Sequence, residues 1–133
     1  MTTPVRAAAA SLLGDVAQGS SLNKIYGRAE RSVAGSERPL LRELVYGSLR
    51  LWPLYKGVTR QLLERPLKAK DSVLEALLIM AMYELDECLT PDYASVSGAV
   101  ECCEQLGRPW ADRLINACLR RYQRDKVFLL QSL

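Results

Sequence analysis

The chain has 133 residues, 49% of them hydrophobic, which is enough for one domain with its own core. It contains no histidine, which excludes Ser-His-Asp and Cys-His catalysis and removes the commonest metal ligand. No apolar run is long enough to cross a bilayer, and the N-terminus lacks the pattern of a signal peptide. We therefore expect a cytoplasmic protein whose four cysteines are free, mostly buried thiols.

The net charge of +3 conceals a segregated distribution. Residues 1–70 sum to +7, residues 71–107 to −8 and residues 108–133 to +4. A fold that brings the two basic segments together would have a basic side suited to phosphate and an acidic side that repels it. The alternative is that these charges form the solvated faces of amphipathic helices.

Apolar residues at helical spacing predict the first two elements. Residues 5–16 form an amphipathic helix that ends at Gly19. Residues 22–34 form a shorter helix with a weaker apolar pattern.

A third helix follows, with Ser36 as a candidate N-cap and a buried stripe that reaches Trp52. Gly47 lies inside it at a cost of about 1 kcal/mol relative to Ala, so we expect a neighbouring helix to approach closely there. Pro53 breaks or kinks this helix, and the helical pattern resumes over residues 55–65.

The second half of the chain predicts three more helices. Residues 72–75 form a capping box for a helix that runs to about residue 85 and is apolar nearly all round, which predicts the central helix of the core. Residues 90–92 open another helix, which Gly107 ends. The last helix runs over residues 110–124. The chain is therefore expected to be all-α, with six or seven helices.

Arginines recur in pairs and stripes on these helices. Arg113, Arg120 and Arg124 share one side of the last helix, opposite an apolar side that includes Trp110. Their forked donors suit phosphate, although cations near a helix C-terminus also favour the helix dipole.

Further arginine pairs, one turn apart, occur at residues 28 and 31 and at residues 38 and 42. Four aromatic residues lie among them and could stack unpaired bases, or could belong to the core. These aromatic residues are Tyr26, Tyr46, Trp52 and Tyr55.

Metal and phosphate-loop motifs are missing from the sequence. No C-x-x-C pair is present, and none of the eight glycines forms a Gly-rich phosphate loop. We therefore expect neither a metal site nor a cofactor site in this chain.

Three ordered stretches carry a resemblance to a known family. They are residues 43–50 (Glu-Leu-Val-Tyr-Gly-Ser-Leu-Arg), residues 77–85 followed by Pro91, and residues 115–121 (Ile-Asn-Ala-Cys-Leu-Arg-Arg). Their order and spacing are similar to those of the NusB-like domain that begins bacterial ribosomal RNA small-subunit (cytosine-5) methyltransferases. The resemblance runs from about residue 6 to residue 124. The Tyr-Gly-x-Leu-Arg element resembles this branch more than the free-standing NusB antitermination factor.

The resemblance implies a NusB-like all-α bundle of two packed subdomains over residues 1–125. Residues 126–133 would then begin a linker to a methyltransferase body that is absent from this chain. RNA binding is the implied activity, in ribosome biogenesis. S-adenosylmethionine is the cofactor implied for the parent enzyme. The chain itself is expected to be no enzyme and to hold no catalytic residue.

The chain departs from the family over residues 93–98. The family usually shows His-Ala-Ala-Val-Asn-Glu, whereas this chain has Tyr-Ala-Ser-Val-Ser-Gly. The apolar positions survive, so the fold should tolerate the change. The polar contacts of the lost side chains are in doubt, and Gly98 should loosen the helix by about 1 kcal/mol.

We expect nine arginines to contact phosphates of small-subunit ribosomal RNA. Arg6 is included because it opens the first helix, where the family has a basic start. The nine are Arg6, Arg28, Arg31, Arg38, Arg42, Arg113, Arg120, Arg121 and Arg124.

One alternative is a docking module that contacts its own methyltransferase body or a ribosomal protein through an acidic surface. Another is a NusB-type transcription antitermination factor. No membrane partner is expected. The acidic residues of the docking alternative are Glu84, Asp86, Glu87, Asp92, Glu101 and Glu104.

Overall fold

The computed structural model describes residues 1–87 and 90–133, so Cys88 and Leu89 lie outside the described residues. Within these ranges the chain forms seven α-helices, three short 3₁₀ turns and no strand, which confirms the all-α prediction. The helices are α1 (Val5–Ala17), α2 (Leu22–Ser32), α3 (Arg38–Arg50), α4 (Trp52–Leu62), α5 (Ser72–Glu87), α6 (Asp92–Gln105) and α7 (Asp112–Gln131). The 3₁₀ turns are η1 (Gly35–Glu37), η2 (Ala69–Asp71) and η3 (Pro109–Ala111).

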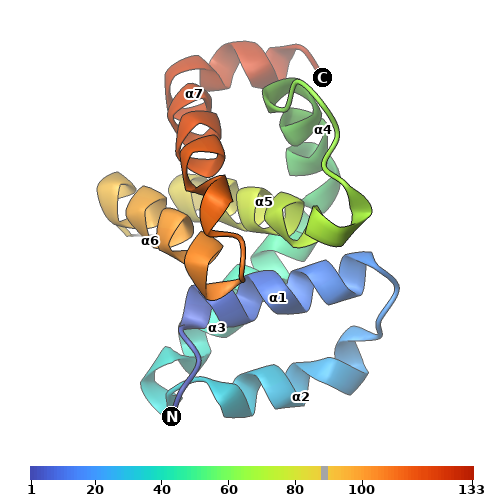
Figure 1. Cartoon of the computed structure of the whole chain (residues 1–133), viewed down its shortest axis with the longest axis vertical. Coiled ribbons are helices and arrows are strands. Elements are labelled where there is room, and N and C mark those ends of the chain that lie inside the picture. Colours follow the sequence, from blue (N-terminus) through green and yellow to red (C-terminus); the bar gives the residue numbers. More distant parts are fainter. Residues whose placement is uncertain (88–89) are drawn as a thin grey trace.

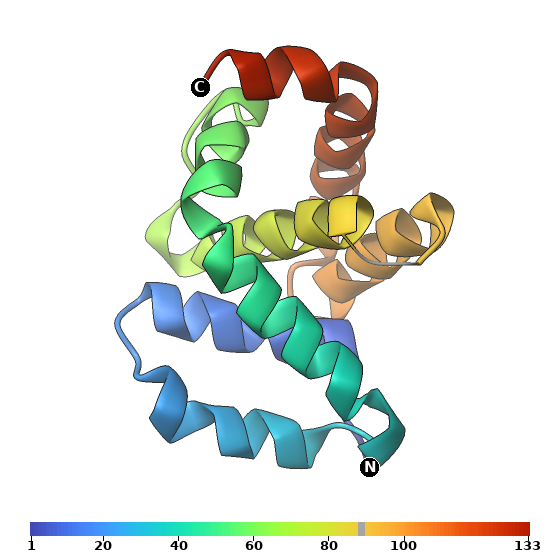
Figure 2. The same ribbon diagram turned by 180° about the vertical axis from the view of Figure 1, so that it is seen from behind.

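Helix α5 crosses the middle of the molecule and separates two groups of helices (Figure 1). Helices α1, α2 and α3 lie on one side, α4 and α7 lie on the other, and α6 lies beside α5 (Figures 1 and 2). Helix α5 touches α1, α3, α4, α6 and α7. Ten of its 16 residues are buried, so the prediction of a central helix is confirmed.

Small residues set the close packing of α1 and α3 against α5. A Cβ at Gly14 of α1 would lie 3.3 Å from Val73 Cγ2, so α1 and the start of α5 are already in close contact. A Cβ at Gly47 of α3 would lie 2.0 Å from Cζ of Tyr83, which is a severe steric clash. The predicted close approach at Gly47 is therefore confirmed. The Tyr83 hydroxyl also donates a hydrogen bond to the carboxylate of Glu43 on α3.

Two predicted helix caps are wrong. Ser36 lies within η1, and α3 begins only after Glu37. Ser72 is already helical (φ −59°, ψ −23°), and its hydroxyl accepts a hydrogen bond from Gln18 instead of capping α5. The physical reason is the same in both places. A 3₁₀ turn precedes each helix and shifts its start, so Ser36 lies one residue before the N-cap position, Glu37, and Ser72 lies inside the first turn of α5.

Helix α7 bends at Asp125, whose backbone is not helical (φ −112°, ψ 17°). Beyond the bend the chain is helical to Gln131 and lies against α4 (Figure 1). Leu129 is buried there, and its carbonyl accepts a hydrogen bond of 3.0 Å from Nε2 of Gln61. The predicted boundary at residue 125 falls at this bend. The linker role of residues 126–133 stays a prediction.

Asp86 joins α4, α5 and α7 through three donors. The hydroxyls of Tyr55 and Tyr122 each donate to Oδ2 at 2.6 Å, and Nζ of Lys126 lies 2.6 Å from Oδ1. Burial, together with the hydrogen bond to Asp86, raises the pKa of both tyrosines, so both stay protonated as donors.

We expect Lys126→Met to loosen the end of α7 without unfolding the domain. The substitution removes the ion pair that fixes the chain just after the bend at Asp125. Because Lys126 is partly exposed, the loss of global stability should stay below about 1 kcal/mol. Amide hydrogen exchange should accelerate over residues 127–131 and stay unchanged in α5. Arg120→Met, whose side chain is exposed and makes no ion pair with the described residues, is the matched control on the same helix. Equal protection of residues 127–131 in all three proteins would contradict this role for Lys126.

Three cysteines are buried free thiols, as predicted, and Cys88 lies outside the described residues. Burial raises the pKa of Cys102 to about 12 and that of Cys103 to about 11. Both are therefore neutral thiols at physiological pH and act as small apolar side chains. None of the helices in the described ranges combines the length and the apolar character that crossing a membrane requires.

Candidate nucleic-acid interface

Four of the predicted arginines gather on α2 and α3, and we call them the α2/α3 arginine cluster. All four side chains are exposed. On α3, Arg38 and Arg42 lie one turn apart and share one side of the helix, whereas Leu41, Leu44 and Val45 are buried. Helix α2 has no buried residue and leaves its basic side to solvent. The cluster consists of Arg28, Arg31, Arg38 and Arg42.

Glu30 ties the two helices of the cluster together. Nε of Arg38 donates to the Glu30 carbonyl at 3.2 Å, and Nη2 of Arg42 lies 3.6 Å from its carboxylate. Arg28 and Arg31 have no carboxylate within ion-pair distance among the residues that the structure describes. The cluster therefore keeps free guanidinium donors for an anionic ligand.

Two tyrosines complete this surface. The rings of Tyr26 and Tyr46 lie 5.6 Å apart between centroids, and the guanidinium of Arg42 lies over both rings, at 5.6 Å and 5.9 Å. Tyr46 is 43% exposed, so one aromatic side chain stands at the surface beside the guanidinium of Arg42. Such an arrangement can hold phosphates and stack an unpaired base.

The two other aromatic residues considered for base stacking belong to the core. Tyr55 is 2% exposed, and its hydroxyl is used by Asp86. Trp52 is partly buried and packs against the core at the start of α4.

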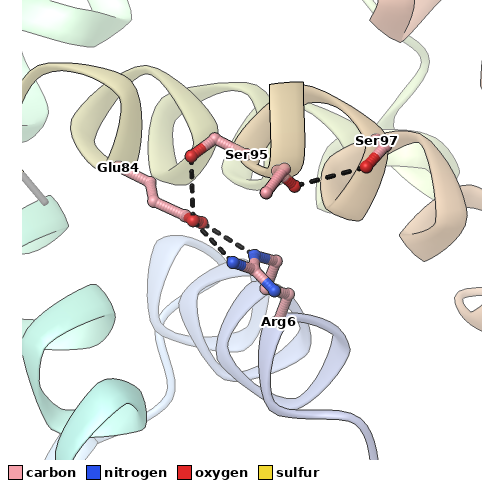
Figure 3. Close-up of polar contacts among 5 residues, drawn as sticks. Arg6, Glu84, Ser95 and Ser97 are labelled. Carbon is pink, nitrogen blue, oxygen red and sulfur yellow. Dashed lines mark hydrogen bonds and ion pairs between the residues drawn. The ribbon is translucent and has the colours of Figure 1, made fainter. Parts of the chain in front are cut away.

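The sequence predicts that Arg6 contacts an RNA phosphate, but in the structure Arg6 lies in an internal ion pair (Figure 3). Its Nε lies 2.8 Å from Oε1 of Glu84, and its Nη2 lies 2.6 Å from Oε2. Glu84 is 1% exposed and also accepts a hydrogen bond of 3.0 Å from Ser95. Two of the three guanidinium nitrogens of Arg6 are therefore used inside the protein, and we leave Arg6 out of the candidate interface.

The departure from the family run surrounds this ion pair. Ser95 supplies a hydroxyl to Glu84, and Gly98 supplies space, because a Cβ there would lie 2.9 Å from Cδ of Arg6. Burial by itself would raise the pKa of Glu84, but the hydrogen bonds and the charge of Arg6 outweigh it and lower that pKa. Glu84 is therefore a carboxylate at neutral pH, and its role is structural.

The arginines of α7 lie apart from the α2/α3 arginine cluster. Helix α2 lies at one end of the molecule, and α1 and α5 lie between it and α7 (Figures 1 and 2). Arg113, Arg120 and Arg124 are exposed on α7. Arg121 is half-buried, and its Nη1 donates to the carbonyl of Gln61 at 3.2 Å. The fold does not join the two basic groups into a single surface.

Half of the acidic residues in residues 71–107 are used inside the fold. Each pairs with a basic residue from a flanking segment, so much of the charge segregation serves folding. The pairs are Asp71–Arg108 (3.3 Å), Glu75–Lys56 (3.7 Å), Glu84–Arg6 (2.6 Å) and Asp86–Lys126 (2.6 Å). The predicted acidic docking surface is therefore wrong for Glu84 and Asp86. Its exposed members are Glu87, Asp92, Glu101 and Glu104.

The sequence analysis missed a basic cleft of about 790 Å³ between the α4–α5 connection and α7. Arg65, Lys68 and Lys70 line it, together with Trp110. Trp110 is 59% exposed, so its predicted inward position is wrong. It lies in η3, before the regular helix α7 begins at Asp112. The cleft could have been suspected from residues 60–70, which hold four Lys or Arg and one Glu.

Comparisons with known proteins agree on one family. A sequence model described as the NusB family matches residues 3–124. Similar curated proteins include "Ribosomal RNA small subunit methyltransferase B" of Vibrio vulnificus (strain YJ016), 37% identical over 126 residues, which are 94% of this chain and 30% of the relative. The protein of that name from Pseudomonas syringae pv. tomato is 37% identical over 129 residues, covering 96% of this chain and 29% of the relative. That of Vibrio cholerae is 38% identical over 123 residues, covering 92% and 28%. The chain thus spans about 30% of the length of these relatives.

Proposed function

Because the chain belongs to the NusB family, we propose that it is the RNA-binding module of a ribosomal RNA small-subunit (cytosine-5) methyltransferase. The module positions ribosomal RNA for a catalytic domain outside this chain. The relatives carry the name of a ribosomal RNA small-subunit methyltransferase, and the chain spans about 30% of their length. The observation that carries the proposal is the α2/α3 arginine cluster, in which Arg28 and Arg31 are unpaired among the described residues and Arg42 lies over Tyr46.

The cluster binds the phosphate backbone of the RNA. Arg38 and Arg42 are oriented by Glu30, and Arg42 is held further by the rings of Tyr26 and Tyr46. A guanidinium that is already oriented loses less conformational freedom when it binds a phosphate. Phosphate contacts fix the register and orientation of the RNA without reading its sequence. The module therefore presents the RNA, and the choice of cytosine belongs to the catalytic domain.

S-adenosylmethionine is the methyl donor that the proposed parent enzyme would use. We assign no residue of this chain to it, because the eight glycines form no Gly-rich loop that could hold a cofactor. The chain contributes RNA binding and orientation.

We expect the double variant Arg38→Glu/Arg42→Glu to weaken RNA binding by about tenfold or more at low salt. Each lost phosphate contact should also reduce the slope of log affinity against log salt by about 0.7 to 0.9. Both side chains are exposed, so the variant should keep the helical circular dichroism and melting temperature of the parent. Fluorescence titration with a small-subunit ribosomal RNA fragment at several salt concentrations measures both quantities.

The matched control is Arg120→Glu/Arg124→Glu, which makes the same change of charge on the exposed side of α7. If binding depends on the α2/α3 arginine cluster, this control should lose much less affinity than the α3 variant. A larger loss in the α7 variant would move the interface to α7. Equal losses would show that binding depends on net charge alone.

A further inference from the structure

The basic cleft beside α7 has two unlike walls. One wall is the α4–α5 connection, which contributes Leu63, Pro66 and Leu67. The other wall is η3 and the first half of α7, which contribute Trp110 and Leu114. At about 790 Å³ the cleft has room for several side chains of a partner.

The floor of the cleft is aliphatic and incompletely covered. Leu63, Leu67 and Leu114 are only partly buried, and Trp110 at the mouth is 59% exposed. An exposed tryptophan beside a row of half-buried leucines is an apolar surface on which a partner could be buried.

The rim of the cleft is positively charged. Arg65, Lys68 and Lys70 are exposed, and in residues 1–87 and 90–133 none of them has a carboxylate within ion-pair distance. Asp71, which also lines the cleft, is already paired with Arg108 at 3.3 Å. Glu64, an exposed carboxylate without an ion pair among the described residues, also lines the cleft. The cleft therefore carries three unpaired cations against one unpaired carboxylate, and the complementary ligand is an anion with apolar groups.

We propose that this cleft docks an acidic segment of a protein partner. Aliphatic or aromatic side chains of that segment fill the floor between Leu67 and Leu114, and its carboxylates meet Arg65, Lys68 and Lys70. A protein segment matches the cleft better than RNA does, because the leucine floor complements branched side chains and Trp110 is the one aromatic side chain among the described residues that line it. This reverses the charge of the docking surface predicted from the sequence, which was acidic. The role is separate from the proposed RNA binding, because α2 and α3 do not line the cleft.

The test is selection from a random peptide library displayed on phage, with the whole domain as target. The selection should enrich peptides that combine several Asp or Glu with Leu, Ile or Phe. A synthetic peptide of an enriched sequence, free of tryptophan, should change the fluorescence of the domain on binding. That change should disappear in Trp110→Phe, because the second tryptophan, Trp52, lies outside the cleft.

Charge reversal then locates the site. Lys68→Glu/Lys70→Glu should lower the affinity of the domain for the selected peptide by about tenfold or more. The matched reversal Arg28→Glu/Arg31→Glu on α2 should leave that affinity unchanged. All four side chains are exposed, so both variants should fold, which circular dichroism checks. Selected peptides without an excess of acidic residues, or binding that Lys68→Glu/Lys70→Glu leaves intact, would overturn the proposal. The proposal would also be overturned if the binding of a single-stranded RNA depended on Lys68, Lys70 and Trp110 while the binding of the acidic peptides did not. The cleft would then be an RNA-binding site.

Discussion

Gly47→Ala is expected to destabilise this protein by about 3 kcal/mol, although replacing Gly by Ala inside an ordinary helix stabilises it by about 1 kcal/mol. The new Cβ would lie 2.0 Å from Cζ and 2.2 Å from the hydroxyl oxygen of Tyr83. The Tyr83 ring is 1% exposed, and its hydroxyl is held by Glu43, so the ring has no room to move aside. Helix α3 would have to move away from α5, which breaks the packing on the central helix.

Urea unfolding followed by circular dichroism measures this loss, and Gly27→Ala is the matched control. Gly27 is also inside a helix, but a Cβ there would meet only Nη1 of Arg31, the mobile end of an exposed side chain, at 3.2 Å. The control should therefore be neutral or stabilised by up to about 1 kcal/mol. A Gly47→Ala protein as stable as the parent would contradict the described contact between α3 and α5.

Arg6→Ala is expected to cost about 3 to 5 kcal/mol, because it leaves the buried carboxylate of Glu84 without its partner. Arg6→Ala/Glu84→Gln should be more stable than Arg6→Ala alone, since the glutamine carries no charge to bury. Thermal or urea unfolding at neutral pH measures both variants. If Arg6→Ala were instead as stable as the parent and defective only in RNA binding, Arg6 would be a phosphate contact after all.

The same pair gives opposite pH dependences in the parent and in the variant. In the parent, the pKa of Glu84 is lowered below its ordinary value of 4.5. The contribution of Glu84 to the free energy of unfolding is therefore complete above pH 4.5, and it is lost as the pH falls through the lowered pKa. In Arg6→Ala, burial without Arg6 should raise the pKa of Glu84 above the ordinary value. The variant should therefore become less stable as the pH rises from about 4.5 toward neutrality, relative to Arg6→Ala/Glu84→Gln. If the free energies of unfolding of Arg6→Ala and Arg6→Ala/Glu84→Gln changed with pH in parallel, this assignment would be contradicted.

The periodicity of apolar residues was sufficient to predict the helical architecture. The central position of α5 followed from its nearly continuous apolar sequence, and the close approach at Gly47 followed from a glycine inside a helix. The errors at Ser36 and Ser72 have a local origin. A 3₁₀ turn and a helix N-terminus share the same residue preferences, so the sequence predicts the start of the helix only to within a turn.

The candidate site was less predictable, because the position of a charged residue in the sequence does not show which residue it pairs with in the fold. Arg6 and Glu84 are 78 residues apart in the chain, and nothing near either residue indicates the ion pair. The surface exposure of Trp110 depends on one 3₁₀ turn. By contrast, the placement of Arg38 and Arg42 on one side of α3 could be predicted, since the two residues lie one turn apart. Local patterns therefore predict which residues are exposed, and the fold decides which of them are free to bind.

The most direct test of the central claim is a fluorescence titration of the unmodified domain with a small-subunit ribosomal RNA fragment over a range of salt concentrations. If the α2/α3 arginine cluster contacts RNA phosphates, log affinity should fall linearly with log salt, with a slope of about −3 to −4 for four contacts. Absence of binding at low salt, or an affinity that salt does not change, would contradict the account of this chain as an RNA-binding module.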